Sequence, residues 1–260
     1  FLKSPKLYYH IFSEMFKFSI ITPTLNQSKY IRQTIDSVLS QNYENKELIV
    51  VDGGSSDGTV DILKEYREIK WISEPDSGAA NALNKGFKMA DGDVIAWLNS
   101  DDYYDENAIF TIAKVFESDV NADLVYGNLT FVDEEGNVLF CNRTEEYKLE
   151  SLVRKYADIV RQPCTFFKKE LLDKTGYLDE SLKCVFDYDL FVRFLRSAHP
   201  KHIDANIAFY RDYKDTLTRK YIRRQGKEII RVSRRNGARI YDKIVLSSFI
   251  KKILFPDFFY

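Results

Sequence analysis

The most chemically suggestive stretch of the chain is the polar run Asn99-Ser100-Asp101-Asp102, which directly follows the apolar segment 94–98. Polar residues at the exit of a buried strand are where α/β proteins bind ligands. Asn99 and Asp101 are two residues apart, so in extended backbone their side chains share one face. One could hold a ribose hydroxyl while the other binds a hard divalent cation through oxygen. The start of a helix is the alternative explanation for these residues alone.

A second candidate is an aspartate that ends another apolar run. Asp52 closes the segment 47–52 and precedes Gly53 and Gly54. The glycines let the backbone approach a ligand closely, and the carboxylate could accept hydrogen bonds from a nucleobase or a ribose. Capping of the following turn would also explain Asp52. Asp57, later in the same turn, is more typical of a turn or helix-cap residue than of a ligand.

A third candidate is a helix start preceded by an acid and a glycine. Asp76 and Gly78 come just before a helical pattern that contains Asn84 and Lys85. A helix N-terminus with a nearby lysine suits a diphosphate. Ordinary helix capping would produce the same pattern.

A fourth candidate is a pair of acids at the start of a later helix, Asp187 and Asp189. An acid there complements the helix dipole at little cost. A catalytic base must in addition lie within hydrogen-bond reach of an acceptor hydroxyl. Asp189 lies about 200° further round the helix than Asp187, where it is expected to cap the helix or to pair with Arg193 at i+4. The residues alone leave the choice of base open.

Alternating strands and helices must position these residues. Apolar β-branched runs predict strands, and apolar residues at helical spacing predict helices between them. This alternation predicts an α/β fold with a single Rossmann-like, mostly parallel sheet flanked by helices. The carboxyl ends of its strands should converge on one site. The predicted strands cover 18–22, 47–52, 70–73 and 94–98, and the helices 31–39, 59–66, 79–90 and 106–118.

The pattern changes in the second half of the chain. A hairpin is predicted from 124–133 and 138–141, further strands at 162–167 and 203–210, and helices from Asp187 and from Arg219. These elements predict a smaller acceptor-side half and a helical tail. The predicted organisation is an N-terminal extension (1–16), a catalytic domain (17–218, with halves 17–118 and 119–218) and a C-terminal tail (219–260).

Charge is balanced overall and uneven locally. The 38 Lys and Arg against 39 Asp and Glu give a net charge of −1, which excludes a strongly basic nucleic-acid binder. Residues 219–252 of the tail hold twelve basic residues and two acidic ones, and Arg223, Lys227, Arg231 and Arg235 recur there at four-residue steps. Such a stripe suits peripheral contact with anionic lipid, or packing on the body or a second subunit. We expect the tail to serve localisation or assembly rather than chemistry.

Cysteine use and hydropathy indicate the compartment. The three cysteines, Cys141, Cys164 and Cys184, are widely spaced, which suggests reduced thiols in a cytoplasmic protein. No apolar run approaches the roughly 18 residues of a membrane span. The expected location is the cytoplasm, with peripheral contact at the inner face of the membrane. The sequence begins at Phe1 without a methionine, so we expect the natural N-terminus to lie upstream.

Taken in order, these motifs resemble the family 2 glycosyltransferases, which have the GT-A fold. The resemblance covers roughly residues 17–218. It implies inverting transfer of a sugar from a nucleotide diphosphate donor, most often UDP-linked, with Mg²⁺ or Mn²⁺ as the cofactor. The acceptor would be a hydroxyl of a glycan, a lipid-linked glycan or another glycoconjugate. The motifs are Thr22-Pro23-Thr24-x-Asn26, Asp52-Gly53-Gly54-Ser55-x-Asp57-Gly58-Thr59, Glu74-Pro75-Asp76-x-Gly78, Asn84-Lys85-Gly86, Asn99-Ser100-Asp101-Asp102, Gln162-Pro163 and Asp187-Tyr188-Asp189-Leu190.

The resemblance also implies roles for single residues. Asp101 would hold the metal and Asp187 would be the catalytic base, while Gln162 and Asp102 would lie on the acceptor side. The nucleoside pocket would be formed by Thr22, Pro23, Thr24 and Asp52. The other donor-binding residues would be Asn26, Asp76, Asn84, Lys85, Asn99 and Ser100.

Three positions depart from the family pattern. Asn99 replaces an aspartate, Phe186 replaces the glutamate before the base, and Tyr213 replaces a histidine that helps to hold metal or diphosphate. The alternative function is therefore a nucleotide-sugar-binding protein without catalysis. Retention of Asp101 and Asp187 favours the enzyme. A nucleotidyltransferase would need a basic, glycine-rich phosphate loop after the first strand, which residues 22–26 do not provide.

Overall fold

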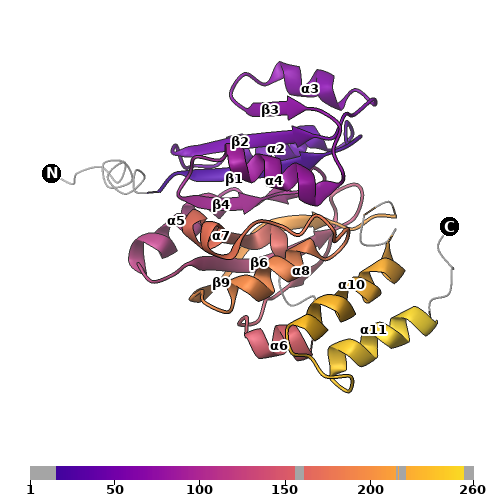
Figure 1. Cartoon of the computed structure of the whole chain (residues 1–260). Coiled ribbons are helices and arrows are strands. Elements are labelled where there is room, and N and C mark those ends of the chain that lie inside the picture. Colours follow the sequence, from indigo (N-terminus) through magenta and orange to yellow (C-terminus); the bar gives the residue numbers. More distant parts are fainter. Residues whose placement is uncertain (1–15, 156–160, 215, 217–220, 255–260) are drawn as a thin grey trace.

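The strands of this protein form one sheet flanked by helices (Figure 1). An apolar core lies on each face of the sheet. The computed structural model describes residues 16–155, 161–214, 216 and 221–254. The predicted α/β fold with a single sheet is confirmed. The strands are β1 (Phe18–Thr24), β2 (Lys46–Asp52), β3 (Lys70–Ser73), β4 (Val94–Trp97), β5 (Tyr103–Tyr104), β6 (Leu124–Val132), β7 (Val138–Asn142), β8 (Thr165–Lys168) and β9 (Pro200–Arg211).

Neighbouring strands run parallel in the first half of the sheet and in mixed directions in the second. The order is β3-β2-β1-β4-β8-β6-β9-β5, with β7 paired to β6. The four strands β3, β2, β1 and β4 are parallel, whereas β8 lies antiparallel to both β4 and β6. The carboxyl ends of β1, β2 and β4 therefore meet at one edge, as the motif order predicts.

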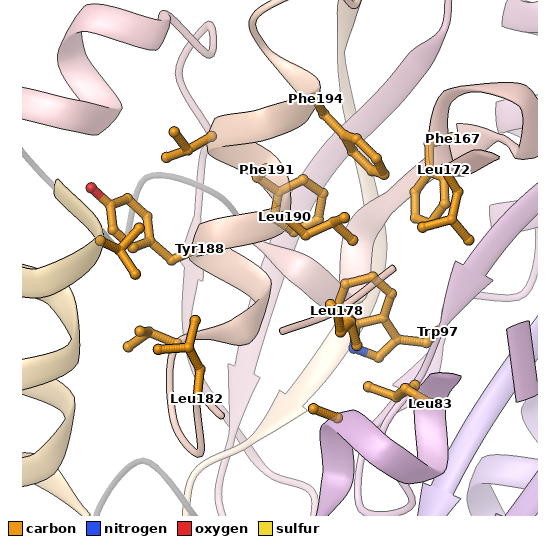
Figure 2. Packing of buried hydrophobic residues seen from close by; sticks show 14 of the residues in the cluster. Leu83, Trp97, Phe167, Leu172, Leu178, Leu182, Tyr188, Leu190, Phe191 and Phe194 are labelled. Atoms are coloured by element: carbon orange, nitrogen blue, oxygen red, sulfur yellow. The ribbon is translucent and has the colours of Figure 1, made fainter. Parts of the chain in front are cut away.

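Consecutive residues of the buried strands alternate between the two cores. Ile20 and Val50 belong to one apolar cluster, and Ile21 and Val51 to the other. Because both faces of the strands are covered, they are nearly continuous apolar runs. Figure 2 shows the second cluster, in which Trp97 of β4 stacks on Phe191 with ring centroids 5.9 Å apart.

Helices cover each face of the sheet. The amphipathic helices α2, α3 and α5 pack on the first cluster, and the remaining helices pack on the second. Their bounds are α2 (Ile31–Leu39), α3 (Thr59–Glu65), α4 (Ala79–Met89), α5 (Ala108–Ser118), α6 (Leu149–Arg154), α7 (Lys169–Thr175), α8 (Phe186–Phe194), α10 (Ile222–Arg235) and α11 (Lys243–Leu254). Among the described residues, no helix is long and apolar enough to cross a membrane.

The structure differs from the predicted elements at short segments. Gln162–Cys164 forms a 3₁₀ helix (η2), and strand β8 begins only at Thr165. Pro163 has no N–H to donate to a strand ladder, which explains the later start. The short elements β5, α6 and α7 carry too few residues to show a period and were not predicted.

The C-terminal helices pack on the body of the protein. Helices α10 and α11 lie beside one another next to α6 (Figure 1). Val232 and Ile244 belong to the same apolar cluster as Leu190 of α8. Of the predicted basic stripe, Lys227 and Arg231 are exposed. Arg235 is also exposed but pairs with Asp189 and Asp179, as described below, and the side chain of Arg223 lies outside the described residues.

Candidate active site

A cavity of about 970 Å³ lies where β1, β4 and the N-terminus of α4 meet. Its volume is in the range of small-molecule sites. Residues from four of the sequence motifs line it, those that follow β1, β2, β3 and β4, although Asp52, Gly53 and Gly54 themselves do not. The predicted donor-binding residues on the wall are Pro23, Thr24, Asn26, Asp76, Asn99, Ser100 and Asp101.

Hydrogen bonds tie together the loops that follow β1 and β2. Asn26 has a left-handed backbone (φ 53°), its N–H donates to Ser55 Oγ at 2.7 Å, and its Oδ1 accepts from the N–H of Ser56 at 2.9 Å. Asp57 accepts from the N–H of Ser28 at 2.9 Å and from the Thr59 hydroxyl at 2.6 Å. Burial by itself raises the pKa of Asp57, but these hydrogen bonds outweigh that effect and lower the pKa to about 2. Asp57 thus stabilises the loop after β2 and also lines the cavity.

Asp52 lies behind the cavity wall rather than on it. Its buried carboxylate accepts hydrogen bonds from the N–H groups of Gly54 and Ser55 at 3.1 and 2.9 Å and from the Ser73 hydroxyl at 2.6 Å. The Ser55 hydroxyl donates to it as well. Asp52 therefore holds the turn, and a direct contact with a nucleoside would require this loop to rearrange. Thr22 is likewise fully buried and does not line the cavity.

Close approach of two loops explains one of the glycines. Asp76 lines the cavity, and its Oδ1 accepts from the N–H of Gly78 at 2.7 Å. A Cβ atom at Gly53 would lie 2.5 Å from Asp76 Oδ2. Only glycine at this position allows the Asp76 carboxylate to keep its place.

Asn84 and Lys85 do not line the cavity, in contrast to the predicted diphosphate site. Asn84 Nδ2 donates to the Leu178 carbonyl at 3.0 Å and to Glu180 Oε1 at 2.8 Å. Lys85 forms an ion pair with Glu74 at 2.7 Å. Lys183, which no motif indicated, lines the cavity at the N-terminus of α4, where its Nζ donates to the carbonyl of Ser77.

The acidic loop after β4 has one carboxylate toward the cavity and one turned inward. Asp102 is 1% exposed and accepts from the N–H of Arg211 at 3.0 Å and from Asn99 Nδ2 at 3.1 Å. Gln162, also buried, accepts from the same amide at 3.4 Å. Burial and the neighbouring Asp101 raise the pKa of Asp102 well above its usual value. Asp102 and Gln162 thus support the loop and do not line the cavity, where acceptor-side residues were expected.

The asparagine at position 99 fits this arrangement. Its amide donates to a buried carboxylate, whereas an aspartate there would place a second negative charge beside Asp102. The replacement therefore removes a charge from the family's acidic pair and supplies a hydrogen-bond donor.

Asp101 is the carboxylate of this loop that faces the cavity. Its Oδ2 accepts from the Tyr213 hydroxyl at 3.0 Å, and its carbonyl accepts from Arg211 Nε at 3.1 Å. Burial raises the pKa of Asp101, although the Tyr213 bond opposes that shift. The described residues contain no cluster of three His, Cys, Asp or Glu side chains suited to a metal. Mg²⁺ is nevertheless often bound by a single carboxylate, such as that of Asp101, together with substrate phosphates and water.

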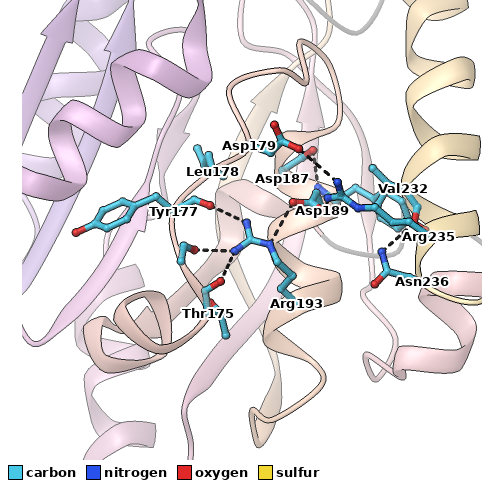
Figure 3. A network of polar contacts seen from close by, with 12 residues as sticks. Thr175, Tyr177, Leu178, Asp179, Asp187, Asp189, Arg193, Val232, Arg235 and Asn236 are labelled. Carbon is cyan, nitrogen blue, oxygen red and sulfur yellow. Dashed lines mark hydrogen bonds and ion pairs between the residues drawn. The ribbon is translucent and has the colours of Figure 1, made fainter.

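The two acids of α8 have different surroundings. Asp187, in the first turn, accepts from the N–H of Tyr188 at 2.7 Å, and burial raises its pKa to about 6. It lies four residues after the cavity-lining Lys183 and does not itself line the cavity. Asp189 is 1% exposed and pairs with Arg193 at 3.1 Å and with Arg235 of α10 (Figure 3). The predicted pairing of Asp189 with Arg193 is confirmed.

The C-terminal segment also reaches the cavity. Tyr221 and Arg224, at the start of α10, line its wall. This placement differs from the expectation of a tail apart from the chemistry. No local pattern indicated it, because a contact between residues 221–224 and the strand ends depends on the path of the whole chain.

The chain belongs to glycosyl transferase family 2, whose family model matches residues 19–176. It is 35% identical over 185 residues to an uncharacterized glycosyltransferase of Rickettsia prowazekii, covering 68% of this chain and 58% of the relative. The chain thus spans little more than half the length of that relative.

Solved structures share the fold. The complex of Staphylococcus aureus TarS 1–349 with UDP-GlcNAc has a TM-score of 0.69 at 19% identity, over 92% of this chain and 73% of the other. A mannosyltransferase of Pyrobaculum calidifontis, in complex with GDP-Man and Mn²⁺, has a TM-score of 0.64 at 17% identity, over 94% and 76%. These similarities place the protein in the GT-A fold.

Proposed function

We propose that this protein is an inverting glycosyltransferase that moves a sugar from a nucleotide diphosphate donor, with a UDP-sugar as first choice, to a hydroxyl of a glycan or glycoconjugate. The observation that carries the proposal is the cavity into which the motifs after β1, β3 and β4 converge. Family membership supports sugar transfer. The nucleotide-sugar complexes of TarS and of the mannosyltransferase, which have the same fold, suggest the donor class.

Two carboxylates have different roles in the proposed reaction. Asp101 would hold Mg²⁺ or Mn²⁺, which would neutralise charge on the departing nucleotide diphosphate. Asp187, which lies off the cavity wall four residues after the lining Lys183, would take the proton of the acceptor hydroxyl as the hydroxyl oxygen attacks the anomeric carbon and the bond to the diphosphate breaks. With a pKa of about 6, Asp187 is mostly deprotonated at pH 7 and still basic enough to accept a proton.

The second candidate function is binding of a nucleotide sugar without catalysis. It is favoured by Asn99 and Tyr213, which replace an aspartate and a histidine of the family pattern. Asp187 argues against it. Its position in α8 keeps a partly buried ionisable carboxyl without an ion pair among the described residues, which a pure binding module has no reason to retain.

A nucleotide-sugar screen tests the proposal. Binding and turnover of UDP-GlcNAc and GDP-mannose, with water or added glycans as the acceptor, are measured with and without Mn²⁺ or Mg²⁺. We expect metal-dependent turnover of at least one nucleotide sugar, and we expect Asp101→Ala to remove that dependence. Glu106→Ala, which removes an exposed carboxylate five residues further on, is the matched control. Metal dependence that survives Asp101→Ala contradicts the assignment.

We also propose that the outer surface of α10 and α11 contacts an anionic membrane. Lys227, Arg231 and Arg234 are exposed and form no ion pair with described residues, and Ile240 and Tyr241 are 63% and 65% exposed. Basic residues beside exposed apolar ones suit the lipid interface. Cosedimentation with phosphatidylserine vesicles at low salt should fall when Lys227 and Arg231 are changed to Glu. No sedimentation of the wild type removes this proposal.

A further inference from the structure

A buried glutamate of the C-terminal helix α10 holds the backbone of the segment that leads into α8. The Glu228 carboxylate accepts hydrogen bonds from the N–H of Lys183, at 3.0 and 3.1 Å to its two oxygens, and from the N–H of Cys184 at 2.9 Å. Glu228 is 7% exposed. Arg224, one turn earlier in α10, donates to it at 2.8 Å and compensates its charge.

The held segment carries residues of the proposed active site. No helix or strand lies between Thr175 and Phe186, so the N–H groups of this connection need partners from elsewhere. Lys183 lines the cavity, and Asp187 follows Cys184 by three residues. The bonds from Glu228 therefore fix the backbone at the point from which Asp187 is presented.

A second contact from α10 holds the same segment two helical turns further on. Arg235 pairs with Asp189 in the first turn of α8 and with Asp179 at 3.4 Å. Arg193 links Asp189 to the carbonyls of Thr175 and Gly176, both at 2.7 Å (Figure 3). Helix α10 thus contacts the residues on both sides of Asp187.

We propose that Glu228 is a positioning residue for glycosyl transfer, which acts by holding the Lys183–Cys184 backbone so that Asp187 meets the acceptor hydroxyl. The inference rests on the proposed function, since Glu228 acts through the base assigned there. It makes the C-terminal helix part of the catalytic unit. Nucleotide binding depends chiefly on the loops after β1, β3 and β4, and Glu228 reaches the cavity wall through its bonds to Lys183 and Arg224.

Substitution of Glu228 should therefore separate turnover from nucleotide binding. A displacement of a catalytic group by about 1 Å can cost on the order of 10²-fold in rate. We expect Glu228→Ala to lower kcat by about 10- to 100-fold, while the Kd for UDP changes by a much smaller factor. Glu228→Gln keeps one carbonyl oxygen that can accept from one N–H, so it should lower kcat less than Glu228→Ala does. Glu170→Ala, which removes an exposed carboxylate of α7 away from the cavity, should match the wild type in both.

A double-mutant cycle separates positioning from general damage to the fold. If Glu228 acts through Asp187, Glu228→Ala should lower kcat no further in an Asp187→Asn background. Losses that multiply, or a wild-type kcat in Glu228→Ala, overturn the inference. Circular dichroism confirms folding, and Glu228→Gln replaces Glu228→Ala in the cycle if the alanine variant does not fold.

The same measurements distinguish this inference from the proposed function. If the wild type turns over no nucleotide sugar, or if Asp187→Asn is as active as the wild type, the proposed function fails and the inference fails with it. If Asp187→Asn is inactive but Glu228→Ala and Glu228→Gln keep the wild-type kcat, only the inference fails.

Discussion

The two aspartates in the first turn of α8 should respond in opposite ways to the same substitution. Asp187 is partly buried without an ion pair among the described residues, and its pKa is raised to about 6. Asp189 is buried with Arg193 and Arg235 as partners. Changing each to asparagine removes one negative charge with almost no change in volume. We expect Asp187→Asn to abolish turnover without loss of stability, and Asp189→Asn to cost stability.

The expected effect at Asp187 follows from its raised pKa. A folded value of about 6 against about 3.9 in the unfolded chain means that the folded state binds the proton more tightly. The stabilising effect of this group is complete below pH ~4 and is lost as the pH rises through about 6. At pH 7 the ionised carboxylate therefore opposes folding, by roughly 3 kcal/mol at most. A neutral asparagine side chain avoids that cost, so the melting temperature of Asp187→Asn should stay level or rise while kcat falls by about 10²- to 10⁴-fold.

The expected effect at Asp189 follows from its two arginines. Removal of one partner from a buried ion pair costs about 3–5 kcal/mol. Arg193 keeps its bonds to three carbonyl groups, and the Arg235 side chain is 39% exposed, so we expect the lower end, about 3 kcal/mol. At about 2–4 °C per kcal/mol, the melting temperature should fall by roughly 6–12 °C.

Thermal unfolding at pH 7 and donor turnover well below the melting temperature measure both effects on the same preparations. An active Asp187→Asn enzyme would refute the assignment of the base. A melting temperature of Asp189→Asn close to that of the wild type would refute the energetic role given to its ion pairs.

Two further predictions concern the base and the donor wall. Turnover should fall about tenfold per pH unit below pH ~6, as Asp187 takes up a proton, and Asp187→Asn should lack this limb; a wild-type rate that is flat down to pH 5 contradicts it. Gly53→Ala would place a Cβ atom 2.5 Å from Asp76 Oδ2, so its carboxylate must move. We expect the UDP affinity measured by calorimetry to fall about tenfold, which corresponds to an overpacking cost of about 1–2 kcal/mol. An unchanged Kd would show that Asp76 does not shape the wall of the donor site.

Local pattern in the sequence was sufficient to predict the sheet and the edge where the site lies. Apolar runs that end in polar motifs predicted β1, β2 and β4. Because parallel strands bring their carboxyl ends to one edge, the meeting of Asn26 and Asp101 in one cavity followed without any long-range information. The Asp189–Arg193 pair was equally predictable, since helix geometry alone fixes an i, i+4 contact.

Only the tertiary structure decided which way the polar side chains turn. Asp101 and Asp102 are adjacent in the sequence, yet the first faces the cavity and the second is buried against the backbone of Arg211, 109 residues away. Lys85 was predicted and Lys183 was not, because the position of a lysine relative to α4 depends on the connection that packs over it. In the same way, Glu228 contacts Cys184 across 44 residues. Burial, hydrogen bonding and pKa depend on groups that the folded chain brings from distant positions, and no spacing along the sequence records them.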